Sequence, residues 1–308
     1  MDLYHKLEYN QIIQIIQGYC KTYLGKKLSF EMEPYFSFEK VRIALAKTME
    51  ATKLLYQKGR PPFAELNEME LPLKTLESNQ ILSAKSLLDL AQLLKISREL
   101  KSYFKEDILG SLANKSFEKG TSQEGESLLQ DYFSTLYANP SIEKEIFDKI
   151  LDENTISDNA SPKLSSLRRS RKNLEQSIKD KLSSLIHSAN YSKYLMEPVI
   201  TIRNNRYVIP VKQEYRSSIQ GFIHDISSSG STVYLEPTSV FEANNQIASI
   251  RMEEDIEIEK ILEQLTASLF EILAELNLNL STIGTLDLLF AKARYAQSYN
   301  GVMPILNQ

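Results

Sequence analysis

Apolar residues recur at steps of three and four along most of the chain, the spacing of helices that bury one face. Outside the central region, this pattern predicts helices over residues 10–23, 37–56, 83–104, 126–137, 142–151 and 281–299. Residues 115–125 are polar and contain glycine, which favours a surface loop. We interpret the apolar stripes as core packing rather than as a cage for a cofactor.

Two longer apolar seams lie further along the chain. Pro162 suits the first turn of a helix, and leucines at three- and four-residue steps follow it, which predicts a helix over residues 163–196. This helix should end just before a proline, because the preceding residue disfavours helix. Ser239 and Glu242 form a capping box for a second helix, predicted to reach about residue 277 and to be roughly 58 Å long.

Residues 203–237, between the two seams, have the pattern of β-strands. β-Branched and aromatic residues gather at 206–211, 219–226 and 232–235. The serine run at 227–231 contains one glycine and suits a tight connection between strands. The predicted fold class is therefore mainly α: a helical core, and two long antiparallel helices that carry a small, mostly antiparallel β-sheet at their far end.

Composition narrows the class of protein. The 308 residues are 42% hydrophobic and 25% charged, as in an ordinary globular protein with a large core. Cys20 is the only cysteine, which excludes an intrachain disulfide and a thiolate-rich metal site. The sequence has no apolar run long enough to span a bilayer and no N-terminal signal pattern, so we predict no membrane association and a cytoplasmic location.

The net charge of −4 hides an asymmetry. Residues 161–220 contain 12 Lys and Arg against 4 Asp and Glu, or +8, and the remainder is 24 against 36, or −12. A basic segment in an acidic protein can form a nucleic-acid surface. It can equally be neutralised within the molecule, because the second long helix is acidic between Glu253 and Glu263. The two interpretations are compatible.

Catalytic constellations within the chain are weak. His5, His187 and His224 do not have the spacing of metal ligands. His224 and Asp225 lie near Ser227 in the sequence and could suggest a base and an acid beside a serine nucleophile. Adjacent strand residues point to opposite faces, however, so we do not expect the two side chains to reach the same serine. The acidic residues of the second long helix could hold a cation, but we interpret them as a solvated or lysine-paired face.

Several blocks of the sequence, in order, resemble one family. They are Arg206-Tyr-Val-Ile-Pro-Val-Lys212, Gly221-Phe-Ile-His-Asp225, Ser229-Gly-Ser-Thr232 and Leu235-Glu-Pro237. They resemble the clamp of the second bacterial branch of the MutS family, which lacks the mismatch-reading domain. Residues 7–23, followed by Leu24-Gly25-Lys26, resemble the start of that branch, and Asp287-Leu-Leu-Phe-Ala-Lys-Ala-Arg294 resembles the last core helix before its ATPase domain.

The resemblance implies an architecture and a set of partners. Residues 1–162 and 265–308 would form a helical core or lever domain, and residues 163–264 an inserted clamp. The family acts as an ATPase homodimer that uses ATP and Mg, often with a nuclease-type Smr domain. Its implied targets are branched recombination DNA, or the RNA and protein surface of collided ribosomes. The oligomeric state of the present chain is left open.

The ATPase motif of that family is missing from this chain. A phosphate loop needs G-x-x-x-x-G-K followed by Ser or Thr, and residues 18–27 have the wrong glycine spacing and no hydroxyl residue after the lysine. We therefore interpret the chain as an N-terminal fragment with no catalytic residues, cofactor or metal of its own.

Two classes of function follow. In the first, the clamp contacts nucleic acid or a ribosome through exposed cations and hydroxyls, which give affinity without reading sequence. The candidate contact residues are Arg203, Arg206, Lys212, Arg216, His224, Ser228 and Ser229. In the second, the region is a structural lever arm that binds a protein partner. Steep loss of binding with added salt would favour the first.

Overall fold

The computed structural model describes residues 8–115 and 127–306. Helices dominate these residues, and a small antiparallel sheet lies between two long helices in the chain, which confirms the predicted mainly α fold class. The chain divides into two compact units: Met1–Thr155 with Leu262–Gln308, here called the core unit, and Ile156–Ile261, here called the arm unit. The sequence predicts domain boundaries between residues 162 and 163 and between residues 264 and 265, and these boundaries stay a prediction.

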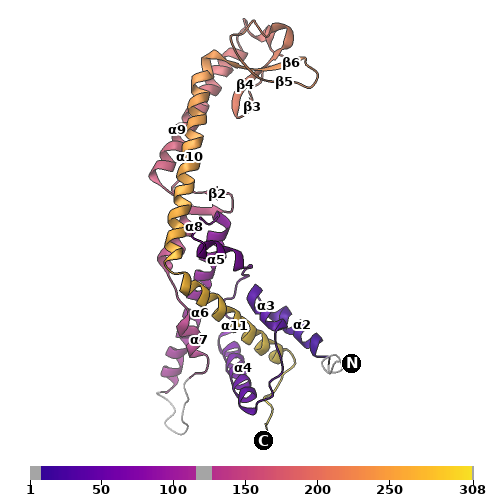
Figure 1. Cartoon of the computed structure of the whole chain (residues 1–308), viewed down its shortest axis with the longest axis vertical. Helices are drawn as coiled ribbons and strands as arrows, with labels where there is room; N and C mark the ends of the chain where they lie inside the picture. Colours follow the sequence, from indigo (N-terminus) through magenta and orange to yellow (C-terminus); the bar gives the residue numbers. More distant parts are fainter. Residues whose placement is uncertain (1–7, 116–126, 307–308) are drawn as a thin grey trace. The chain divides into compact units, whose positions relative to one another are not determined.

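The core unit is built around α11 (Leu273–Ser298), which lies against most of the other helices of that unit (Figure 1). α11 packs against α2 (Tyr9–Tyr19), α3 (Tyr23–Phe30), α4 (Phe38–Lys58), α5 (Glu70–Glu77), α6 (Ala84–Lys115) and α7 (Gln130–Thr135). α6 also contacts α8 (Pro140–Lys149), which leads into the short pair β1 (Ile150–Asp152) and β2 (Thr155–Ile156). Phe290 of α11 meets Phe63 and Phe133 edge to face, at centroid distances of 5.9 and 6.5 Å.

A buried carboxylate joins the N-terminal and C-terminal segments of the chain within the core unit. Asp287 of α11 accepts hydrogen bonds from the N–H groups of Lys21 and Thr22, and from Thr22 Oγ1 at 2.8 Å. Thr22 Oγ1 in turn accepts from the N–H of Gly25 at 2.9 Å and caps α3. A Cβ at Gly25 would lie 2.4 Å from Asp287 Oδ2. The blocks Leu24-Gly25-Lys26 and Asp287–Arg294 therefore form one structural junction.

In the arm unit, α9 (Pro162–Ile186) runs antiparallel to the part of α10 (Thr238–Phe270) that precedes residue 262, as predicted (Figure 1). The direction follows from the ion pairs: Lys163 meets Glu257, Arg171 meets Glu254, and Glu175 meets Arg251. Ser161 caps α9 by accepting from the N–H of Leu164, with Pro162 at the first helical position.

The sheet of the arm unit has the order β3-β4-β6-β5, antiparallel throughout. Its strands are β3 (Thr201–Arg203), β4 (Arg206–Lys212), β5 (Gly221–Ile226) and β6 (Thr232–Pro237). The sheet packs on the last turns of α9 and the first turns of α10. The shared core is Ile178, Leu182, Ile186, Leu195, Tyr207, Ile209, Val211, Ile219, Leu235, Val240 and Ile247. The sheet thus lies at one end of the helix pair, as predicted.

The first long helix is shorter than predicted, because α9 ends at Ile186 rather than at residue 196. The residues that follow include Ser188 and Asn190, which are poor helix formers. Leu195 instead forms a bridge with Val211, and the N–H of Met196 donates to the carbonyl oxygen of Pro210. Pairing with β4 therefore satisfies backbone groups that a longer helix would have satisfied internally.

Other boundaries also differ from the prediction. The second long helix ends at Phe270 rather than near residue 277, and α11 begins at Leu273 instead of at 281. The predicted helix over 10–23 is two helices, α2 and α3, separated at Cys20–Thr22 by the junction with Asp287. The helix predicted over 83–104 continues to Lys115, and the rest of the loop predicted over 115–125 lies outside the described residues.

Candidate nucleic-acid interface

A buried carboxylate, Glu236 on β6, organises the polar side chains of the sheet. Its side chain is 0% exposed and accepts from Arg206 Nη1 at 2.9 and 3.0 Å and from Asn244 Nδ2 at 2.7 Å. His224 Nε2 lies 2.5 Å from its second oxygen. A buried charge requires hydrogen-bonding or charged partners. Since these partners come from β4, β5 and α10, the network joins three strands of the sheet to α10. Both the Arg206 and the His224 side chain contact Glu236 within the molecule. Their contact with nucleic acid stays a prediction.

The backbone around Glu236 explains two residues of the Gly221–Asp225 block. A Cβ at Gly221 would lie 2.1 Å from the carbonyl oxygen of Glu236, so only glycine fits there. The pairing of β5 with β6 shifts register between Ile223 and Asp225, which makes His224 the extra residue of a bulge. The bulge directs His224 toward Glu236, while Asp225 pairs with Arg203.

Arg203 lies at the β3–β4 turn. Its guanidinium is 4.1 Å from the ring centroid of Tyr234, and its Nε is 3.3 Å from Asp225 Oδ2. Asn204 and Asn205 form the two-residue turn with φ of 49° and 62°, the left-handed conformation that such a turn needs. The Arg203 side chain remains 38% exposed, so it can contact a ligand at this turn.

The serine run connects β5 to β6 and holds its own shape. Ser227 Oγ accepts from the N–H of Thr232 at 3.0 Å, and Ser229 Oγ lies 2.8 Å from Ser231 Oγ. Gly230 has a φ of 71°. Ser228 and Ser229 are exposed. Their hydroxyls therefore face solvent at the end of the hairpin.

Lys212 and Arg216 lie in a group of cations and tyrosines, here called the basic–aromatic cluster. Its members are Tyr191, Lys193, Tyr194, Lys212, Tyr215 and Arg216. Lys212 Nζ donates to the carbonyl oxygen of Lys193 at 3.2 Å, and Lys193 Nζ lies 4.9 Å from the ring centroid of Tyr194. The Tyr194 ring is 5.2 Å from that of Tyr215, and 6.5 Å from that of Tyr191. Two 3₁₀ turns, η1 (Ser192–Tyr194) and η2 (Gln213–Tyr215), supply half of the cluster, and the residues that cap these turns supply the other half.

The cluster has the chemistry of a phosphate-binding surface. Lys193 and Arg216 are exposed, Lys212 is half-buried, and none of the three forms an ion pair with another described residue. Glu197 and Glu214 are the nearest acidic residues in the sequence, and both are exposed. Ammonium and guanidinium groups bind phosphates, and tyrosine rings stack on unpaired bases.

The cations of α9 differ from those of the cluster, because many of them form ion pairs with acidic side chains of the same unit. Arg168 and Arg171 both meet the buried Glu254, and Lys172 meets Asp158. The hydrogen bond to Glu254 raises the pKa of Arg171 further above its usual range. The intramolecular interpretation of the charge asymmetry therefore holds for this part of the basic segment.

The sequence identified only part of the cluster. Lys212 and Arg216 were predicted from the strand pattern, whereas Tyr191, Lys193 and Tyr194 fell inside the helix predicted over 163–196. The short run Tyr-Ser-Lys-Tyr, directly after Asn190, is a signal that could have placed them outside a helix.

No group of three or more His, Cys, Asp or Glu side chains with the geometry of a metal site occurs among the residues described. None of the helices in that same part of the chain is long and apolar enough to cross a membrane.

The fold and this site define a helical protein with an inserted unit of two antiparallel helices and a small sheet bearing a basic surface. Comparison with curated proteins gives a consistent result. The chain is 40% identical to the protein named Endonuclease MutS2 from Acetivibrio thermocellus, 37% to that of Ruminiclostridium cellulolyticum, and 36% to that of Clostridium perfringens strain SM101. Each match covers 98% of this chain and 36% of the relative. No family model matches the sequence.

These matches extend over nearly the whole chain, so the chain is similar to a part of the proteins named Endonuclease MutS2, in agreement with the resemblance of its sequence blocks. The chain spans about a third of the length of these relatives.

Proposed function

We propose that this chain is the core and clamp region of a MutS-family ATPase, and that its basic–aromatic cluster contacts the phosphate backbone of a nucleic acid. The observation that supports the proposal is the cluster itself: Lys193 Nζ lies 4.9 Å from the Tyr194 ring centroid, Lys212 Nζ donates to the carbonyl oxygen of Lys193, and Arg216 directly follows Tyr215 in the chain. None of the three cations has an ion-pair partner among the described residues. Arg203, Ser228 and Ser229 would add contacts at the adjacent turns.

The proposed targets are branched DNA or the RNA of collided ribosomes. ATP and Mg would act in a domain outside this chain, in a cytoplasmic homodimer. There the complete protein would suppress recombination or split stalled ribosomes. This chain would supply binding and transmit motion, and it would catalyse no step itself.

The test is binding of the 308-residue chain to four-way junction DNA and to stalled disomes, side by side, at several salt concentrations. Phosphate contact predicts that the logarithm of the binding constant falls steeply with the logarithm of salt concentration, by about 0.9 per contact on duplex DNA. The target with the higher affinity at physiological salt would be the better candidate. Weak binding that does not depend on salt would contradict phosphate contact.

A second candidate function is a lever arm that binds a protein partner. β5 is an edge strand whose side chains Phe222, Ile223 and Ile226 are 49%, 48% and 50% exposed. An exposed apolar edge is typical of a protein-binding surface. Replacing Phe222 and Ile226 with Ser should then abolish binding to ribosomes while leaving junction DNA binding intact.

A further inference from the structure

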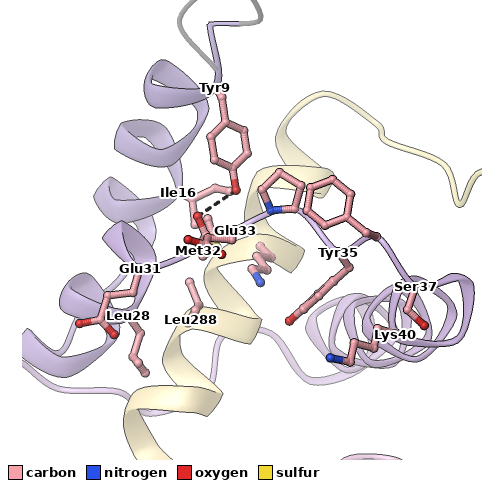
Figure 2. A pocket seen from close by; sticks show the side chains of 13 residues that line it. Tyr9, Ile16, Leu28, Glu31, Met32, Glu33, Tyr35, Ser37, Lys40 and Leu288 are labelled. Carbon is pink, nitrogen blue, oxygen red and sulfur yellow. Dashed lines mark hydrogen bonds between the residues drawn. The ribbon is translucent and has the colours of Figure 1, made fainter. Parts of the chain in front are cut away.

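Two adjoining cavities open on α11 in the core unit, away from the residues discussed so far. The larger, of about 930 Å³, is lined by α2, the segment at residues 31–37, α4 and α11 (Figure 2). The smaller, of about 410 Å³, lies between α4 and α11, with Tyr132 of α7 in its wall. Tyr35, Lys40, Leu288 and Lys292 line both. The two volumes are in the range of small-molecule sites.

Three lysines give the smaller cavity a positive charge. Lys40, Lys47 and Lys292 line it, and its lining has no Asp or Glu among the described residues. Lys47 Nζ donates to the hydroxyl of Tyr132 at 2.8 Å, a neutral partner that leaves the ammonium charge in place. Glu31 and Glu33 line the larger cavity only, and no described residue forms an ion pair with any of the three lysines.

Lys292 is the most unusual of the three. It is half-buried on α11 and lies near Cys20, whose thiol carries no charge at neutral pH. Burial lowers the pKa of Lys292. An ammonium removed from water without an acid beside it is destabilising, and a bound anion would relieve that cost.

The remaining lining of the two cavities is aromatic and apolar, which suits the base of a nucleotide whose phosphates would contact the lysines. Tyr35 is 53% exposed, and Figure 2 shows it reaching from the segment at 31–37 while Lys40 extends from α4. Its ring and the apolar side chains of Ile43 and Leu289 can cover a flat base. The hydroxyls of Thr48 and Thr285 donate to their own helices, so they offer only lone pairs to a ligand.

We propose that this cavity binds a nucleoside diphosphate or triphosphate, with its phosphates at Lys40, Lys47 and Lys292 and its base against Tyr35. The ligand takes part in no reaction here, which agrees with the lack of a phosphate loop. A carboxylate-bearing peptide would satisfy the charges but would leave the ring and the apolar wall without a function. The site is separate from the basic–aromatic cluster and stands without it.

The probe is ADP without added metal, titrated calorimetrically into the 308-residue chain, with pyrophosphate and adenosine titrated separately. ADP should bind more tightly than either part, because both halves of the cavity contribute. Lys292→Met and Lys47→Ala should each weaken ADP binding by about tenfold or more, as expected for the loss of one charge-assisted contact. Tyr35→Ala should weaken ADP binding but leave pyrophosphate binding unchanged.

Two controls make the result specific. Lys53→Ala removes the same charge from an exposed position on α4 outside the cavity, and it should leave ADP binding unchanged. Lys212→Ala with Arg216→Ala, in the arm unit, should also leave it unchanged. Thermal melts identify any variant that does not fold. Because Lys292→Met and Lys47→Ala change different helices, one of them still tests the proposal if the other does not fold.

Absence of ADP binding at millimolar concentration would overturn the proposal. So would ADP binding that neither Lys292→Met nor Lys47→Ala weakens. Equal affinity for ADP and pyrophosphate would overturn the assignment of a nucleoside.

Discussion

At the scale of single residues, several of the blocks that resemble the family have structural functions. Gly25 makes room for Asp287, Gly221 makes room for the backbone of Glu236, and Arg206 neutralises the Glu236 carboxylate. The sequence revealed these residues as a pattern but not their partners, because each contact joins segments far apart in the chain. Of the candidate contact residues, Lys212 and Arg216 keep their cations free of carboxylates among the described residues, whereas Arg206 does not.

The Asp287 junction leads to a prediction on stability. Gly25→Ala places a methyl group against Asp287 Oδ2 and should destabilise the chain by about 1–3 kcal/mol, the range for overpacking. Chemical denaturation measures the free energy of unfolding. Gly18→Ala is the matched control, since a Cβ there meets nothing within 4 Å, and it should be neutral or stabilising. Equal effects of the two changes would contradict the junction as described.

Cys20 should be chemically inert in the folded chain. Cys20 is 3% exposed, and burial, aided by the charge of Asp287, raises the pKa of its thiol to about 12. Because the thiolate is the reactive form, a disulfide reagent at pH 8 should label Cys20 only after denaturant is added. Since the folded pKa lies above the unfolded value of 9.0, the contribution of Cys20 to stability is complete below pH 9 and is lost as the pH rises toward 12. Rapid labelling of the native chain would refute this.

At the scale of elements, the sheet depends on the pairing around Glu236. Glu236→Gln removes the charge that Arg206 and His224 face, and breaking a buried pair typically costs 3–5 kcal/mol. Asp225→Asn removes a carboxylate that is 46% exposed and paired with Arg203 in the same sheet, and it should cost less than about 1 kcal/mol. Denaturation of the two variants measures the difference, and a larger loss in Asp225→Asn would be inconsistent with the structure.

The sequence predicted the elements better than their ends. The two long helices and the β-rich block follow from local spacing, so their existence and order could be predicted. The end of α9 depends on the bridge between Leu195 and Val211, and the division between α10 and α11 at Glu271 and Ile272 contains no glycine or proline. Tertiary pairing decides such boundaries, and a single sequence does not show it. Tyr191 and Tyr194 of the basic–aromatic cluster were missed because they lie within the stretch between the end of α9 and residue 196, which the sequence predicted to be helical.

At the scale of the whole molecule, charge is divided between two uses. The cations of α9 mostly stabilise the arm unit by pairing with α10 and Asp158, and those of the basic–aromatic cluster remain available to a ligand. The net charge of the segment could not separate these uses, since both kinds of cation lie within residues 161–220. We therefore propose that the position of a cation in the arm unit, rather than the net charge of the segment, determines binding to nucleic acid.

Two double variants of equal charge separate the effect of a cation's position from the effect of net charge. One is Lys212→Ala with Arg216→Ala; the other is Arg169→Ala with Lys181→Ala, two exposed cations of α9 without an ion-pair partner among the described residues. Junction DNA or ribosomes, whichever binds the unchanged chain, is titrated at several salt concentrations, with thermal melts of each protein. We predict that the first variant binds more weakly and that its salt slope falls by about one unit per lost phosphate contact, while the second binds as the unchanged chain does and both melt normally. Equal weakening in the two variants, or unchanged binding in the first, would contradict the account.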